Sequence, residues 1–151
     1  SCHQSILGIK VEQRGFDLCA KTKTVCYYRH MKEIKLSDCT FEQRDGYERA
    51  VLLSNEDFKS NTKIQLMRLA AGQSIRPHHH EFRTECFRSG YGEGQIKING
   101  RVVASSSDNI VLCEVGDVHE FINTSETKPF TFLVVRTNDI GNEDMIWEDL
   151  S

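Results

Sequence analysis

The apolar residues of this 151-residue chain come in short runs with β-branched or aromatic members, and long helical periodicity is scarce. The runs lie at residues 6–11, 24–28, 63–69, 95–98, 101–104, 110–113 and 129–135. Turn signals separate them, and the clearest is Asn99-Gly100, which favours the type I′ turn of a β-hairpin. The pattern therefore predicts an all-β domain, a compact sandwich or barrel with little helix.

The length of the chain fits one domain, which at this size buries about 68–70% of the surface of its unfolded chain. We expect residues 31–151 to form this domain, because Met31 opens a stretch typical of a natural start and Ser1 is typical of a cloning remnant. Residues 1–30 are expected to be an N-terminal extension. Two forms stay open for it, an extra hairpin at a sheet edge and a segment tied to a partner chain.

Charge and cysteine content indicate the class of partner and the compartment. Lys and Arg number 19 against 22 Asp and Glu, a net charge of −3, whereas a nucleic-acid binder needs a basic surface. No run approaches the roughly 18–20 apolar residues of a membrane span. The six cysteines form no CxxC pair and no secretory apolar segment opens the chain, so we expect free thiols and a cytoplasmic protein. We therefore expect neither a nucleic-acid nor a membrane partner.

The stretch from Asp139 to Asp149 holds five acidic residues and no Lys or Arg. We expect an acidic tail that Trp147 docks onto the body of the domain.

Three consecutive histidines lie in the middle of the chain. In an extended strand His78 and His80 point to one face and His79 to the other. A turn after His80 would carry Glu85 onto the next strand, facing the same interior, and His119 opens a later strand. Three imidazoles and one carboxylate suit one divalent transition metal, with Fe, Mn or Ni favoured and Zn left open.

The spacing of these residues resembles that of a known family. Gly72-x5-His78-x-His80-x4-Glu85-x6-Gly92 resembles the first cupin motif, and Gly116-x2-His119-x3-Asn123 resembles the second half of the second cupin motif. The core motifs thus span residues 72–123, and the resemblance covers about residues 60–136. It implies a double-stranded β-helix, or jelly-roll, barrel of the small single-domain cupin type.

The resemblance also implies a class of function, since cupins with three histidines and one glutamate include dioxygenases, decarboxylases and sugar-phosphate isomerases. We expect a metal-dependent enzyme that acts on a small organic molecule, with dioxygenase-like oxidation of an organic acid as the favoured reaction. Two alternatives stay open: a non-catalytic small-molecule binding or sensor cupin, and a sugar-phosphate isomerase or epimerase. Because small cupins pair through edge strands, we also expect a homodimer.

Four further side chains are candidates for the substrate pocket. Phe87 and Phe121 each stand two residues beyond a predicted ligand and share its inward face. Arg136 ends an alternating run and could meet an anionic substrate at the barrel mouth, and Arg68 has the same pattern. Structural roles stay open for all four, core packing for the phenylalanines and surface salt bridges for the arginines.

Overall fold

The computed structural model describes residues 32–104, 108–141 and 144–149. The predicted extension at 1–30, with its runs at 6–11 and 24–28, lies outside the described residues. The chain divides into two compact units, Ser1–Thr40 and Phe41–Ser151. In the first, the described part contains one 3-10 turn, η1 (Leu36–Asp38). The second unit carries the strands.

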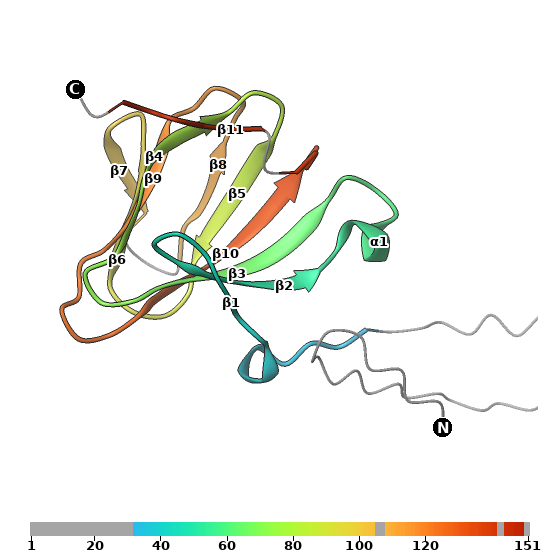
Figure 1. The fold of residues 1–151 in the computed structure, drawn as a ribbon, viewed down its shortest axis with the longest axis horizontal. Helices are drawn as coiled ribbons and strands as arrows, with labels where there is room; N and C mark the ends of the chain where they lie inside the picture. The colour runs from blue at the N-terminus through green and yellow to red at the C-terminus, as the bar shows by residue number, and fades with distance from the viewer. Residues whose placement is uncertain (1–31, 105–107, 142–143, 150–151) are drawn as a thin grey trace, which may run out of the picture. The chain divides into compact units, whose positions relative to one another are not determined.

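Two antiparallel sheets form the second unit (Figure 1). The first sheet has the order β1-β2-β3-β10-β5-β8, with bounds β1 Glu42–Gln43, β2 Glu48–Leu53, β3 Lys63–Leu69, β10 Phe130–Thr137, β5 Thr84–Ser89 and β8 Ile110–Cys113. The second has the order β11-β4-β9-β6-β7, with bounds β11 Met145–Trp147, β4 Ser74–His80, β9 His119–Asn123, β6 Gly94–Ile98 and β7 Arg101–Ala104. One short helix, α1 (Asn55–Phe58), follows β2. In the described part of the chain, no helix has the length and apolar character needed to cross a bilayer.

The predicted all-β fold is confirmed, and several of its strands lie where the sequence places them. The runs at 63–69, 101–104 and 110–113 coincide with β3, β7 and β8. The Asn99-Gly100 turn joins β6 to β7, with φ angles of +50° and +78°. Asn and Gly tolerate this left-handed backbone, which gives the turn the twist that a hairpin needs.

Alternation along the strands builds the core between the two sheets. In β10 every second residue from Phe130 to Arg136 is buried. The apolar members of this set join inward residues of both sheets in one cluster: Met67, Leu69, Ile75, Phe87, Ile96, Cys113, Phe121, Phe130, Phe132 and Val134. Burying each large apolar side chain contributes about 1.5–3 kcal/mol, so this cluster is the main source of stability.

The loop between β5 and β6 packs closely on β10. Gly92 has a φ of +95°, and a Cβ there would collide with the carbonyl oxygen of Pro129. A Cβ on Gly94 would overlap the ring of Phe130. The last glycine of the predicted motif therefore permits a close backbone contact.

Candidate metal centre

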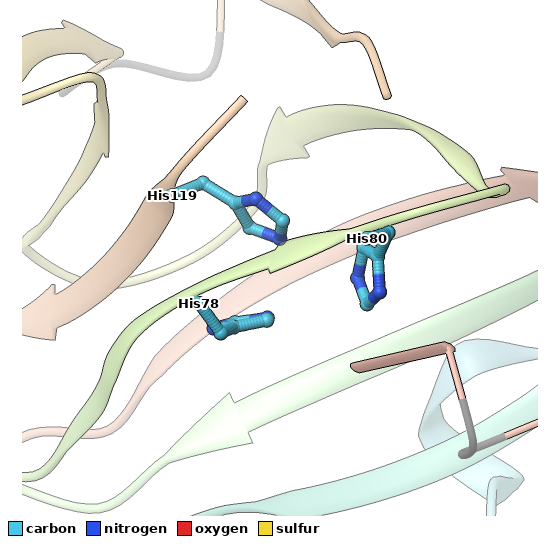
Figure 2. A group of neighbouring side chains, drawn as sticks. All are labelled: His78, His80 and His119. Carbon is cyan, nitrogen blue, oxygen red and sulfur yellow. The ribbon is translucent and has the colours of Figure 1, made fainter. Parts of the chain in front are cut away.

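The three predicted histidine ligands come together inside the barrel. His78 and His80 extend from β4, and His119 extends from the start of β9 (Figure 2). β4 pairs with β9 so that His78 lies opposite His119. All three residues are between 1 and 3% exposed, and one nitrogen from each ring lies within 4.8 Å of the others. His79 points to the other face of β4, as its parity predicts, with Nδ1 2.5 Å from Oε1 of Glu148.

Hydrogen bonds to the backbone set the orientation of all three rings. Each Nδ1 lies beside a carbonyl oxygen: that of Arg76 at 2.9 Å for His78, that of Asp144 at 3.2 Å for His80, and that of Asp117 at 3.0 Å for His119. Because a carbonyl oxygen only accepts, each Nδ1 donates its proton and each Nε2 keeps its lone pair. This is the tautomer in which imidazole binds a metal through Nε2.

The free nitrogens fit a bound metal ion. Nε2 of His80 and Nε2 of His119 are buried and have no hydrogen-bond partner among the described residues. Buried polar atoms are nearly always partnered, so unpartnered lone pairs that converge on one point favour a cation between them. Burial, followed by the charge of His119, lowers the pKa of His78 to about 3, which keeps its ring neutral. The three histidines could therefore hold a divalent transition metal.

Glu85 reaches these histidines from the opposite sheet. The turn after His80 leads into β5, and the carboxylate of Glu85 extends back across the barrel. Its Oε1 lies 3.5 Å from Nε2 of His80, and its Oε2 lies 3.4 Å from Nε2 of His119. The group of atoms close enough to share one ion contains only the histidines among the described residues. Glu85 as a fourth ligand stays a prediction.

Arg136 is the charge partner of Glu85. Its Nε lies 2.6 Å from Oε1 of Glu85, and the residue is 5% exposed. Burial by itself would raise the pKa of Glu85, but the charge of Arg136 and the neighbouring side chains of His119 and His80 hold that pKa well below its usual range. The surface salt bridge considered for Arg136 is wrong, because the alternation of β10 turns this side chain inward.

Comparison with protein families identifies the fold around this site. The cupin domain family, Cupin_2, matches residues 65–136, which include all four predicted ligands. The chain contains a cupin domain. A comparison with curated proteins found no match.

Solved structures of other cupin-like proteins are similar to this one. A predicted oxalate decarboxylase from Thermotoga maritima is 26% identical with a TM-score of 0.62, over 69% of this chain and 96% of that chain. The polyketide cyclase RemF from Streptomyces resistomycificus is 19% identical with a TM-score of 0.64, over 80% of this chain and 87% of that chain. A protein with a double-stranded β-helix domain from Klebsiella pneumoniae is 21% identical with a TM-score of 0.60, over 78% and 96%. They support the jelly-roll barrel expected from the motifs.

A small cavity opens beside His78 and Glu85. His78, Glu85, Arg136 and Tyr47 supply its polar lining. The rest of its lining is apolar: Met67, Ile75, Phe121, Phe132, Val134 and Met145. The site thus combines one buried ion pair with mostly apolar walls.

Two of the predicted pocket residues, Phe87 and Arg68, do not line this cavity. Phe87 is fully buried, with its ring 4.9 Å from that of Phe121, and it packs in the core. Arg68 lies on the outer face of β3, where its Nε is 2.7 Å from Oε2 of Glu48 and its guanidinium covers the ring of Phe41. The alternation of β3 turns Arg68 away from the cavity, so the prediction that Arg68 lines the pocket is wrong.

Residues that the sequence did not point to surround the centre. Arg83 and Asp144 are each 1% exposed, although the first lies in a turn and the second in the acidic tail. Sγ of Cys113 lies 3.3 Å from Nδ1 of His119. Burial, with the charges of Glu85 and Asp117, raises the pKa of Cys113 to about 12, so its thiol stays protonated.

Trp147 is the residue through which the sequence predicts that the acidic tail contacts the body of the domain. β11 pairs with β4, and the Trp147 ring lies 5.1 Å from the ring of His78. Trp147 therefore docks the tail, as expected from the sequence.

Proposed function

We propose that this cupin is a metal-dependent enzyme that oxidises a small organic acid in a dioxygenase-like reaction. The observation that carries the proposal is the convergence of three buried imidazoles, two of which have an unpartnered Nε2 and the third of which lines a cavity. A bound Fe, Mn or Ni ion would supply Lewis-acid polarisation or dioxygen activation at this point. His78, His80 and His119 would hold the ion, and Glu85 would complete the set.

The lining of the cavity favours an acid as the substrate. Arg136 is the one cationic side chain among the lining residues, so it offers the carboxylate of a substrate a charged donor. The remaining walls are largely apolar, which suits the body of a small organic molecule and keeps water from it. The similar protein from Thermotoga maritima is a predicted oxalate decarboxylase, a name that specifies an organic acid.

The same lining disfavours a sugar phosphate. Such a substrate presents several hydroxyl groups and a phosphate, each of which needs a partner when it is buried. The lining offers one arginine, one tyrosine and the metal-site residues, which are too few partners for several hydroxyl groups and a phosphate. We therefore propose the organic acid rather than the isomerase alternative.

Metal analysis of protein purified without added metal tests the site. We expect close to one transition-metal ion per chain in the wild type and a near-complete loss in His80→Ala. His79→Ala is the matched control, because His79 is adjacent but faces away from the cluster, and it should keep the metal. Equal and negligible metal in all three proteins would refute the metal centre.

Dioxygen uptake tests the reaction. The metal-loaded wild type is mixed with a panel of small organic acids and thiols in an oxygen electrode. We expect uptake with at least one acid and none with His80→Ala. Tight binding of an acid without any turnover would instead support the sensor alternative.

A further inference from the structure

We propose that Asp144 is a positioning residue for the metal centre: it fixes the turn that joins His80 to Glu85, and it orients the His80 ring through contacts at Nδ1. This inference rests on the metal site proposed above. Asp144 comes from the acidic tail, 64 residues beyond His80, and it is 1% exposed.

The carboxylate of Asp144 holds the backbone of the β4–β5 turn. Its Oδ1 accepts hydrogen bonds from the N–H groups of Glu81 at 2.9 Å and Phe82 at 2.8 Å. Its Oδ2 accepts a third, from the N–H group of Arg83 at 3.1 Å. Hydrogen bonds to an ionised acceptor are about twice as strong as neutral ones, so three of them define the conformation of this turn. This β4–β5 turn separates His80 from Glu85, two of the predicted ligands.

The main chain of Asp144 acts on the His80 ring directly. Its carbonyl oxygen lies 3.2 Å from Nδ1 of His80, and its Oδ2 lies 3.7 Å from the same nitrogen. The carbonyl oxygen accepts the Nδ1 proton, which leaves the lone pair on Nε2, and Oδ2 places a negative charge near the same nitrogen. In metal sites the partner of the second ring nitrogen fixes the tautomer and raises the basicity of the ligand.

Arg83 connects Asp144 to the Glu85 side of the centre. Its Nε lies 3.5 Å from Oδ2 of Asp144, and its Nη1 lies 3.6 Å from Oε1 of Glu85. The same guanidinium pairs with Asp139 at 3.0 Å and donates to the carbonyl oxygen of Gly141. Three carboxylates are thus gathered around one buried arginine, which restrains where the Glu85 carboxylate can lie.

Strand β11 holds Asp144 in register with the ligand strand. It begins at the next residue and pairs with β4, with Met145 opposite His80 and Trp147 opposite His78. The hydrogen bonds between β11 and β4 fix the position of Asp144 relative to β4. They therefore place the Asp144 carboxylate next to the β4–β5 turn. The acidic tail is therefore part of the support of the metal centre.

Titration of the full-length apoprotein with Co²⁺ tests this role, because Co²⁺ gives both an affinity and a visible spectrum. Asp144→Ala removes all carboxylate contacts but keeps the main-chain carbonyl, and Asp144→Asn keeps an acceptor oxygen and removes the charge. Asp149→Asn is the matched control, an exposed acid in the same tail. We expect about 10–100-fold weaker Co²⁺ binding for Asp144→Ala, a smaller loss for Asp144→Asn, and none for the control. The visible bands of the Co²⁺ form should shift in both Asp144 variants.

The outcomes separate this proposal from the one on which it rests. If the wild type fails to bind Co²⁺, the metal centre itself is refuted. If the wild type binds and both Asp144 variants bind within twofold with an unchanged spectrum, the positioning role is refuted. Circular dichroism of the apoproteins shows whether each variant is folded, and Asp144→Asn carries the test if Asp144→Ala does not fold.

Discussion

At the scale of single residues, the buried pair of Arg136 and Glu85 sets the charge of the cavity. We expect Arg136→Met to lower the free energy of unfolding of the apoprotein by about 3–5 kcal/mol, because it removes the nearest charge partner of the buried Glu85 carboxylate. Arg68→Met is the control, since the pair of Arg68 with Glu48 is about a third exposed and such pairs contribute about 0–1 kcal/mol. Urea unfolding in the presence of a chelator measures both. Similar losses in the two variants would contradict the assigned role of Arg136.

Asp139 gives the protein an acid-sensitive contact outside the metal centre. Burial raises its pKa, but the hydrogen bond from Lys63 at 2.6 Å and the charge of Arg83 outweigh burial and lower it below 3.8. The unfolded chain therefore takes up the proton first as the pH falls. The stabilisation by Asp139 is fully present above about pH 4 and is lost as the pH falls through the lowered pKa.

We expect this loss to appear in melting temperatures measured between pH 3 and pH 6. Asp139→Asn should be less stable than the wild type at pH 6 and should show a flatter decline toward pH 3. Asp149→Asn, at an exposed position, should follow the wild-type curve. Parallel curves for the wild type and Asp139→Asn would show that Asp139 does not contribute.

At the scale of elements, the two motif glycines that flank β4 and β5 differ in their surroundings. Gly72 and Gly92 both have positive φ, at +68° and +95°, but only Gly92 has other atoms within 4 Å of an added Cβ. We expect Gly72→Ala to cost about 1 kcal/mol from backbone strain. Gly92→Ala should cost about 1–3 kcal/mol more, because its Cβ would collide with the carbonyl oxygen of Pro129. Thermal unfolding measures both, and equal costs would contradict the close contact between this loop and β10.

How far the sequence predicts an element depends on whether its hydrogen bonds and its burial pattern are local. β7 and the Asn99-Gly100 turn were predicted because an apolar run and a two-residue turn are both visible in a short window. β11 was not predicted as a strand. It has three residues in an acidic segment, and it forms because β4, some 65 residues earlier, supplies its partner. Because the partner strand is distant in sequence, β11 has no alternating pattern of its own that would predict a strand.

The difference between local and non-local contacts also explains which residues of the metal centre the sequence predicts. The three histidines were predictable from strand parity and motif spacing, which are local. The burial of Arg136 and Asp144 was not, because a charged side chain is buried only where a distant partner compensates it. For Arg136 the partner is Glu85, and for Asp144 the partners are the backbone of the β4–β5 turn and Arg83.

At the scale of the whole molecule, the outer strand β8 supports the expectation of a homodimer. Ile110 is 71% and Leu112 is 59% exposed on this strand, which has a partner on one side only among the described strands. Edge strands with exposed apolar side chains tend to pair with another chain. We expect light scattering to give twice the chain mass of 17.3 kDa for the wild type and the single mass for Leu112→Lys. A monomeric wild type would contradict the prediction.

Metal binding should also stabilise the whole domain, because the predicted ligands come from both sheets. His78, His80 and His119 belong to the sheet of β4 and β9, and Glu85 belongs to the sheet of β5. An ion that binds only the folded state adds about 2.7 kcal/mol at a hundred times its Kd, or about 5–10 °C in the melting temperature of a domain of this size. We expect a chelator to remove this increment from the wild type and from His79→Ala. In Glu85→Gln the increment should be smaller, because the ion then has no ligand in the second sheet, and a full increment in that variant would exclude Glu85 from the ligand set.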